Sequence, residues 1–174
     1  PCATPVEGQP GSCLISHEIR YSMIDTIAFD ADDTLWHNET LYQDAQAEFQ
    51  EIVSQWAAED EVHRILTEIE LSNLSLYGYG IKAFTLSMIE TALKVSRNQI
   101  GAEDIEKILA LGRSMLEAEV DLLPNIKEVL RALSPNHRLM IITKGDLLDQ
   151  TSKITRSGLE KYFSLVEVLN HKTP

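Results

Sequence analysis

The sequence predicts an α/β protein, with a doubly wound parallel sheet that is interrupted by an inserted bundle of helices. The first observation is a set of short apolar runs typical of buried parallel strands. The second is a long middle region, residues 39–120, in which apolar residues recur at helical spacing. The third is the alternation of strand and helix after this region, which favours parallel pairing. The expected strands are residues 24–30, 137–143 and 163–169.

The first expected strand, residues 24–30, is apolar and β-branched, and we expect it to lie in the centre of the sheet. Four helices should follow it and form a bundle. Their turns contain glycine at residues 77–80 and 96–101, where a helix end needs a permissive backbone. The expected helices are residues 39–59, 60–74, 80–95 and 101–119.

The last third of the chain reads as an α/β unit. A helix over residues 124–134 should begin with Pro124 in its first turn. A second helix should begin after Asp146, a good N-cap residue, and end before Gly158. The chain therefore divides into four expected parts: a flexible leader (residues 1–22), a first core segment (23–37), a helical cap (38–121) and a second core segment (122–174).

Composition restricts the function. The formal net charge of −12 disfavours nucleic acid and anionic membranes as partners. There is no apolar run long enough for a membrane helix and no signal-peptide pattern, so we expect a cytoplasmic protein. Cys2 and Cys13 are the only cysteines and lie in the irregular leader, which argues against a disulfide framework or a structural zinc site.

Two carboxylates, Asp30 and Asp32, follow the first expected strand. Open α/β sheets bind ligands at this end of their strands. One carboxylate could attack phosphorus while the other carries a proton to the leaving oxygen and later takes one from water. The simpler alternative is an acidic turn that caps a helix or lies in solvent.

The segment FDADDTLW, residues 29–36, resembles the first motif of the haloacid dehalogenase superfamily. The resemblance implies a Rossmann-like core, with Asp30 as the nucleophile, Asp32 as the general acid and base, and Thr34 as a supporting residue in the turn. It also implies a Mg²⁺ cofactor, bound by Asp30 and Asp32.

Two later positions are similar to further motifs of that superfamily. Thr143 ends the second strand, as the second motif does, and Lys172 follows the third strand, as the phosphate-steadying lysine does. The resemblance implies that both contact phosphate. Lys144 and Lys153 are weaker candidates for the lysine role.

The resemblance implies a phosphatase that acts on a small phosphorylated metabolite through an aspartyl-phosphate. Alternatives are a haloacid dehalogenase, a phosphotransferase, or a non-catalytic interaction module on an incomplete core. Family dehalogenases lack the aspartate that Asp32 provides, which favours phosphate chemistry. The superfamily's fourth motif supplies further metal carboxylates, and because none follows here we expect that the C-terminal part of the core is missing.

Substrate specificity should come from the cap. Tyr77, Tyr79 and Lys82 lie at an expected corner of the bundle, where a lid can place polar and aromatic groups over the site. Core packing for the tyrosines and solvent for the lysine is the alternative. Trp36 and His37 lie at the hinge into the cap, and we interpret His37 as an ordinary linker residue. The sequence does not indicate an oligomeric state.

Overall fold

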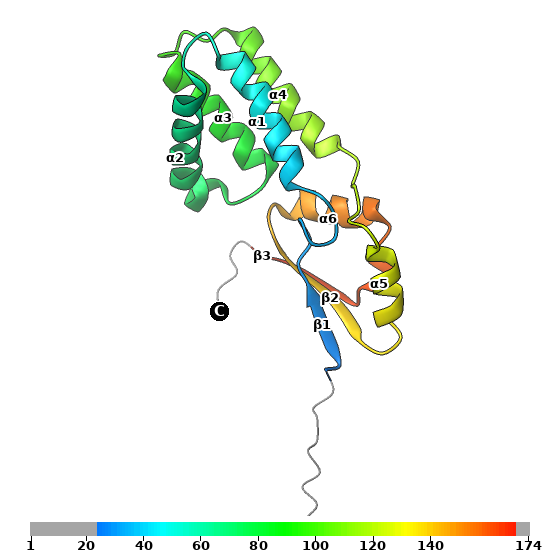
Figure 1. The fold of residues 1–174 in the computed structure, drawn as a ribbon. Coiled ribbons are helices and arrows are strands. Elements are labelled where there is room, and N and C mark those ends of the chain that lie inside the picture. Colours follow the sequence, from blue (N-terminus) through cyan, green and yellow to red (C-terminus); the bar gives the residue numbers. More distant parts are fainter. Residues whose placement is uncertain (1–23, 170–174) are drawn as a thin grey trace, which may run out of the picture.

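The computed structural model describes residues 24–169; the predicted leader, Lys172, Cys2 and Cys13 lie outside the described residues. The described residues form three strands and six α-helices, in the order expected for an α/β fold with an inserted group of helices (Figure 1). In chain order they are β1 (Thr26–Phe29), α1 (Glu39–Val53), α2 (Glu59–Tyr77), α3 (Ile81–Val95), α4 (Ala102–Glu117), α5 (Ile126–Leu133), β2 (Arg138–Lys144), α6 (Leu147–Ser157), the short 3₁₀ helix η1 (Glu160–Tyr162) and β3 (Leu165–Leu169).

The sheet is parallel, which confirms the predicted fold class. The strand order is β1-β2-β3, and Phe29 of β1 lies beside Ile141 of β2. Within residues 24–169 no strand pairs with the other side of β1, so β1 is an edge of the described sheet and not its centre as predicted. Thr26 and Ala28, which point to the same face of this strand, are exposed.

One face of the sheet is packed against helices. Leu139 and Ile141 of β2 are buried together with Leu130 of α5 and Ile154 of α6. Alternate residues of a strand point to opposite faces, so Met140 lies on the other face, where it is only half-buried. The core therefore fixes α6, and with it the residues that the helix presents at its N-terminal end.

The four inserted helices form a bundle with a core of its own. Phe49 of α1, Phe84 and Met88 of α3, and Ile108 of α4 are buried in one apolar cluster. Gly112 of α4 lies directly against the buried Thr85 of α3, where a Cβ atom would overlap the threonine side chain. Glycine is unfavourable inside a helix, and this close approach of two helices explains its presence.

The two ends of α6 follow the expected chemistry, whereas α1 ends at Val53, before the predicted residue 59, and α5 begins later than predicted. The carboxylate of Asp146 accepts the backbone N–H of Asp149 at 3.0 Å, and Gly158 has a φ of +67° just after α6, so both predicted caps of this helix are confirmed. By contrast, Pro124 does not lie in the first turn of α5. That helix begins at Ile126, because Asn125 takes a left-handed conformation before it.

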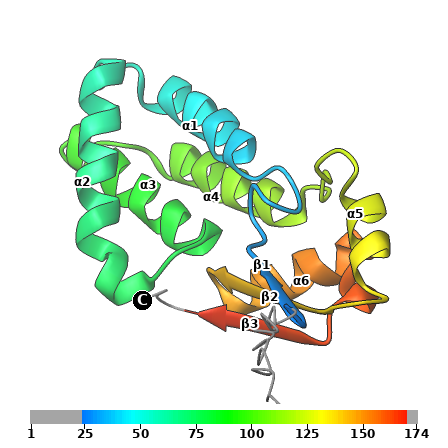
Figure 2. The same cartoon turned by 60° about the horizontal axis from the view of Figure 1, so that its bottom comes forward.

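The bundle lies beyond the carboxyl ends of the strands, and two connections lead to it (Figures 1 and 2). The guanidinium of Arg156 on α6 donates to the backbone carbonyls of Leu116, Glu117 and Ala118 at the end of α4. A last-turn carbonyl has no partner within its own helix, so this arginine caps α4 from the core side.

Within the described chain, no helix is both long and apolar enough to cross a bilayer.

Candidate active site

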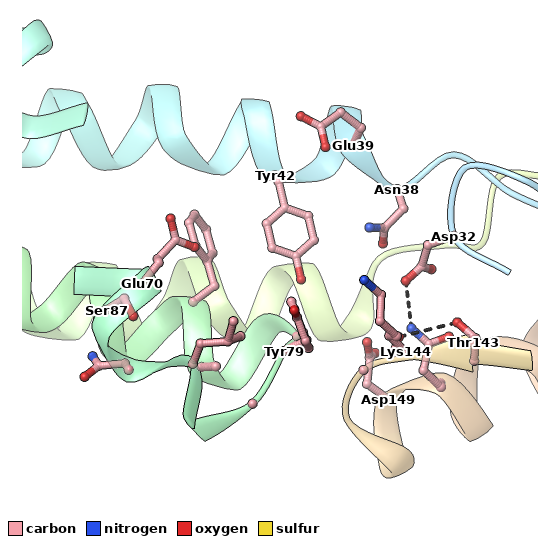
Figure 3. Close-up of a pocket in the computed structure, with 18 of the residues that line it drawn as sticks. Asp32, Asn38, Glu39, Tyr42, Glu70, Tyr79, Ser87, Thr143, Lys144 and Asp149 are labelled. Atoms are coloured by element: carbon pink, nitrogen blue, oxygen red, sulfur yellow. Dashed lines mark hydrogen bonds between the residues drawn. The ribbon is translucent and has the colours of Figure 1, made fainter. Parts of the chain in front are cut away.

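A cavity of about 580 Å³ lies between the carboxyl edge of the sheet and the bundle. Figure 3 shows the side chains around it. Residues from both layers line it: Asp30, Asp32, Asn38, Thr143, Lys144, Gly145, Asp149, Gln150 and Lys153 from the core side and the hinge, and Glu39, Tyr42, Thr67, Glu70, Leu71, Asn73, Leu74, Gly78, Tyr79, Gly80, Ala83, Phe84 and Ser87 from the cap. The structure thus brings the predicted Asp30, Asp32, Thr143 and Lys144 to one cavity.

The turn after β1 holds Asp30 and Asp32 at this cavity. The backbone N–H groups of Thr34 and Leu35 both donate to the carbonyl of Ala31, at 3.1 and 2.8 Å. Thr34 thus lies in the turn to which the sequence assigned it, and it acts there through its backbone. This turn follows β1 directly and leaves both Asp30 and Asp32 lining the cavity.

Asp33 joins the same turn to the cap. It has a φ of +55°, uncommon for a residue other than glycine, and its carboxylate accepts the backbone N–H groups of Asn38 and Glu39 at 2.9 and 3.0 Å. These groups open α1 and have no partner within the helix. A helix-capping role, the alternative interpretation of Asp30 and Asp32, thus belongs to Asp33.

The carboxylate of Asp32 accepts hydrogen bonds from three side chains. Oδ1 accepts from the Trp36 indole at 2.7 Å and from the Lys153 ammonium at 3.3 Å, and Oδ2 accepts from the Gln150 amide at 2.7 Å. Trp36 and Gln150 are buried. Asp32 is consequently held in one orientation at the mouth of the cavity.

Lys153 is a buried cation in the middle of this network. Its ammonium lies 3.2 Å from a carboxylate oxygen of Asp149 and donates to the side-chain oxygen of Asn38 at 2.9 Å. Burial raises the pKa of Asp149, and the positive charge of Lys153 opposes this shift. Lys153 therefore links the carboxylate of Asp32 to α6 and to the hinge of the cap.

Thr143 and Lys144 face the same space from the end of β2. Thr143 is almost fully buried, and Lys144 is exposed, with its ammonium 4.8 Å from the centre of the Tyr79 ring. Gly145 follows with a φ of +143°, and a Cβ atom there would lie 3.0 Å from the Gln150 amide nitrogen. A larger residue there would press on the Gln150 amide that donates to Asp32 and would keep a positive φ.

The predicted specificity residues lie in three different settings. Tyr79 lines the cavity. The Tyr77 hydroxyl donates to Glu90 at 3.2 Å, and Lys82 pairs with Asp146 at 3.0 Å. Neither Tyr77 nor Lys82 is among the residues that line the cavity. Lys82 instead connects the cap to the start of α6, and a role in specificity for any of the three stays a prediction.

Comparison with known proteins gives the family. A family model of haloacid dehalogenase-like hydrolases matches residues 24–170. The chain belongs to the haloacid dehalogenase-like hydrolase family. A search of curated proteins gave no match.

Solved structures of haloacid dehalogenase-like hydrolases share the fold. A family hydrolase from Xanthomonas campestris is 39% identical with a TM-score of 0.82, over 87% of this chain and 64% of that one. The putative hydrolase YfnB from Bacillus subtilis, described as bound to magnesium, is 18% identical with a TM-score of 0.56, over 83% of this chain and 65% of that one. A 2-haloacid dehalogenase from Pseudomonas syringae is 18% identical with a TM-score of 0.55, over 84% and 64%. The chain thus spans less than two thirds of each of these relatives.

The haloacid dehalogenase-like site also contains residues that the sequence did not single out. Gln150 and Asp149 belong to α6, and Asp149 and Lys153 are four residues apart, a spacing that indicates a pair on one helix face. This spacing is the feature of the sequence from which the network around Asp32 could have been predicted. Tyr42 and Asn73 come from α1 and α2, and nothing in the sequence relates those helix faces to the sheet edge.

The oxygen donors at the sheet edge suit the Mg²⁺ ion that this family implies. Mg²⁺ binds hard oxygen ligands, often only one or two carboxylates with waters and substrate phosphate. Within residues 24–169 there is no group of three or more His, Cys, Asp and Glu side chains placed to hold a metal. As membership of this family implies, the Asp30 carboxylate and the backbone carbonyl of Asp32 would hold the ion, while the Asp32 carboxylate accepts three hydrogen bonds.

Proposed function

We propose that this chain is the catalytic part of a magnesium-dependent phosphatase that hydrolyses a small phosphorylated metabolite. The observation that carries this proposal is the placement of Asp32, two residues after Asp30 and lining the same cavity. Loss of an alkoxide from phosphorus needs an acid to protonate the leaving oxygen. Loss of halide does not, so the second aspartate supports phosphate chemistry over dehalogenation.

The reaction has two steps, both at phosphorus. A carboxylate oxygen of Asp30 attacks phosphorus, the bond from phosphorus to the leaving oxygen breaks, and Asp32 gives its proton to that oxygen. Water then attacks the aspartyl-phosphate, Asp32 takes the proton of the water, and the bond between phosphorus and Asp30 breaks. Inorganic phosphate and the original carboxylate of Asp30 result.

Other residues of the cavity offset the negative charge of the phosphoryl group. A bound Mg²⁺ would neutralise charge on the phosphoryl oxygens and on Asp30. The Thr143 hydroxyl and the Lys144 ammonium lie at the end of β2, and α6 begins just beyond them with backbone N–H groups that favour an anion. We assign phosphate binding to Thr143 and Lys144, and the same role to Lys172 on the resemblance of its motif.

The structural relatives do not separate a phosphatase from a dehalogenase. The Pseudomonas dehalogenase is 18% identical to this chain and shares its fold, and a shared fold does not determine the reaction. The choice between the two reactions therefore depends on side chains. Asp32 is the deciding side chain, because loss of an alkoxide needs an acid and loss of halide does not.

The test is hydrolysis of 4-nitrophenyl phosphate and of 2-chloropropionate by the complete protein, with Mg²⁺ and with excess chelator. We expect phosphate release that requires Mg²⁺, no halide release, and loss of activity in Asp30→Asn. Asp44→Asn, which changes an exposed carboxylate on α1, is the matched control and should retain activity. Halide release, or full phosphatase activity in Asp30→Asn, would contradict the proposal.

A further inference from the structure

Two connections join the core to the cap (Figure 1), and they pair with each other. In the first of them, Trp36 lies between Leu35 and His37. The backbone N–H of His37 donates to the carbonyl of Asp121 in the second connection at 2.8 Å. The backbone N–H of Leu123, also in the second connection, donates to the carbonyl of Leu35 at 3.1 Å. Trp36 thus lies between two backbone hydrogen bonds and is held by both connections.

The indole of Trp36 is packed in the core and reaches the site. The residue is only 1% exposed and belongs to the apolar cluster that contains Leu130 and Leu139. Its indole N–H donates to Oδ1 of Asp32 at 2.7 Å. A hydrogen bond of this length to a carboxylate is a strong one, and a ring packed on its faces has little freedom to turn away. The orientation of Asp32 is therefore tied to the paired connections.

The donors around Asp32 distinguish its two oxygens. Oδ1 faces the Trp36 indole and the Lys153 ammonium, and both of these groups donate hydrogen bonds and accept none. Oδ2 accepts from the Gln150 amide. A proton on Oδ1 would point at groups that are themselves donors, so the acid form of Asp32 carries its proton on Oδ2.

Resting on the proposed phosphatase function, we propose that Trp36 is a positioning residue, which occupies Oδ1 of Asp32 and leaves Oδ2 to carry the proton for the leaving oxygen. In the first step this proton moves from Oδ2 to the leaving oxygen as the bond from phosphorus to that oxygen breaks. In the second step Oδ2 takes a proton from the attacking water. Lys153 shares its ammonium with Asp149 and Asn38, whereas the single N–H of the indole serves Asp32.

Loss of this hydrogen bond should matter more for a poor leaving group. Phenolate leaves less readily than 4-nitrophenolate, so hydrolysis of phenyl phosphate depends more on the proton of Asp32. The two esters have nearly the same shape and give the same aspartyl-phosphate. The second step is therefore common to both, and a comparison of their kcat/KM values isolates the step in which Oδ2 gives up its proton.

The test compares Trp36→Phe with the wild type in the complete protein, with phenyl phosphate and 4-nitrophenyl phosphate as substrates. We expect kcat/KM to fall at least about tenfold more for phenyl phosphate, the effect of losing one hydrogen bond to a charged group. Both substrates are measured on one preparation, so a smaller folded fraction cancels in the ratio. A merely loosened core would lower both values alike.

Trp56→Phe is the matched control, at the other tryptophan of the chain. The Trp56 ring packs against the core of the bundle, and its indole nitrogen has no hydrogen-bond partner among residues 24–169. The same substitution there should keep the wild-type ratio of the two kcat/KM values. If Trp36→Phe does not fold, benzothienylalanine at position 36 replaces the N–H by sulfur in a ring of nearly the same shape, and it should give the same change in ratio.

An unchanged ratio, including an equal loss for both substrates, would overturn the role of Trp36, and so would the same change in Trp56→Phe. Wild-type hydrolysis of 4-nitrophenyl phosphate with no turnover of phenyl phosphate would also overturn it, because no proton would then reach the leaving oxygen; the phosphatase function would stand in that case. Failure to hydrolyse 4-nitrophenyl phosphate would remove the phosphatase function and the role of Trp36 together.

Discussion

At the scale of single residues, Lys153 has the most connections of any cation in the described site. The sequence made it a weaker candidate for contact with phosphate. The structure places it away from solvent, with its ammonium against Asp32, Asp149 and Asn38. Its environment indicates a residue that positions Asp32, and a buried ion pair of this kind is sensitive to loss of one partner.

Replacing Lys153 by methionine should destabilise the protein in a pH-dependent way. Asp149 would remain buried without its cation, a change that costs about 3–5 kcal/mol in comparable pairs. Burial already raises the pKa of Asp149 in the folded state, so the folded protein binds this proton more readily than the unfolded chain. The deficit should therefore be large at neutral pH and shrink as the pH falls through the folded-state pKa. Urea denaturation at about pH 7.5 and about pH 5 measures it.

The matched control for this prediction is Lys127→Met, at an exposed lysine of α5. It should change the free energy of unfolding by less than about 0.5 kcal/mol at either pH. A Lys153→Met protein as stable as this control, or a deficit that grows as the pH falls, would show that the pair with Asp149 is not what Lys153 stabilises.

At the scale of elements, the loop between β2 and α6 decides whether Gln150 reaches Asp32. Gly145→Ala should displace the Gln150 side chain, because the new Cβ atom would lie 3.0 Å from the Gln150 amide nitrogen and the residue would keep a positive φ. We expect a loss of about 1–3 kcal/mol in the free energy of unfolding and a lower kcat. Gly101→Ala is the control, since nothing lies within 4 Å of a Cβ atom there and φ is −80°.

The ends of helices were predicted correctly where residues within one helical turn determine them. Asp146 and Gly158 cap α6 as expected, because capping depends on residues within one turn. The start of α5 was wrong, because Asn125 takes a left-handed conformation that Pro124 and the helical periodicity do not reveal. Predictions for the ends of elements thus failed where a single backbone angle decides the boundary.

At the scale of the whole molecule, a few polar contacts attach the cap to the core. Arg156 donates hydrogen bonds to three carbonyls at the end of α4, and Lys82 of the cap forms an exposed ion pair with Asp146 of the core. Both ties are exposed, but Arg156 makes three charge-assisted hydrogen bonds and Lys82 makes one. Arg156 should therefore be the principal tie on this side of the cap.

Arg156→Met should loosen the connection after α4 without unfolding the bundle. We expect faster amide hydrogen exchange in residues 116–123, because the last carbonyls of α4 lose their partner, and little change around Phe49 and Met88 in the bundle core. Arg131→Met, at an exposed arginine of α5, is the control. Equal protection of residues 116–123 in both variants would contradict the role assigned to Arg156.

The site could be predicted from sequence on its core side and only there. Asp30, Asp32 and Thr143 follow strands, and the carboxyl ends of parallel strands necessarily meet. Tyr42 and Asn73 could not be predicted, because their distance from Asp32 depends on how the bundle is oriented over the sheet. Hydrophobicity shows that the first strand packs but not how many neighbours it has, and among the described residues it lies at the edge of the sheet.

The central claim is that Asp30 accepts the phosphoryl group, and the most direct test is to trap that group. Asp32→Asn should slow hydrolysis of the aspartyl-phosphate more than its formation, since the water step depends on Asp32 as the base, with an overall loss of about 10²–10⁴-fold in kcat. The variant is mixed with 4-nitrophenyl phosphate and Mg²⁺, quenched in acid and mapped by peptide mass spectrometry. We predict one phosphoryl group on the peptide that contains Asp30, and none when Asp30→Asn is added to the variant. Steady turnover with no modified peptide, or a phosphoryl group on another residue, would contradict the account.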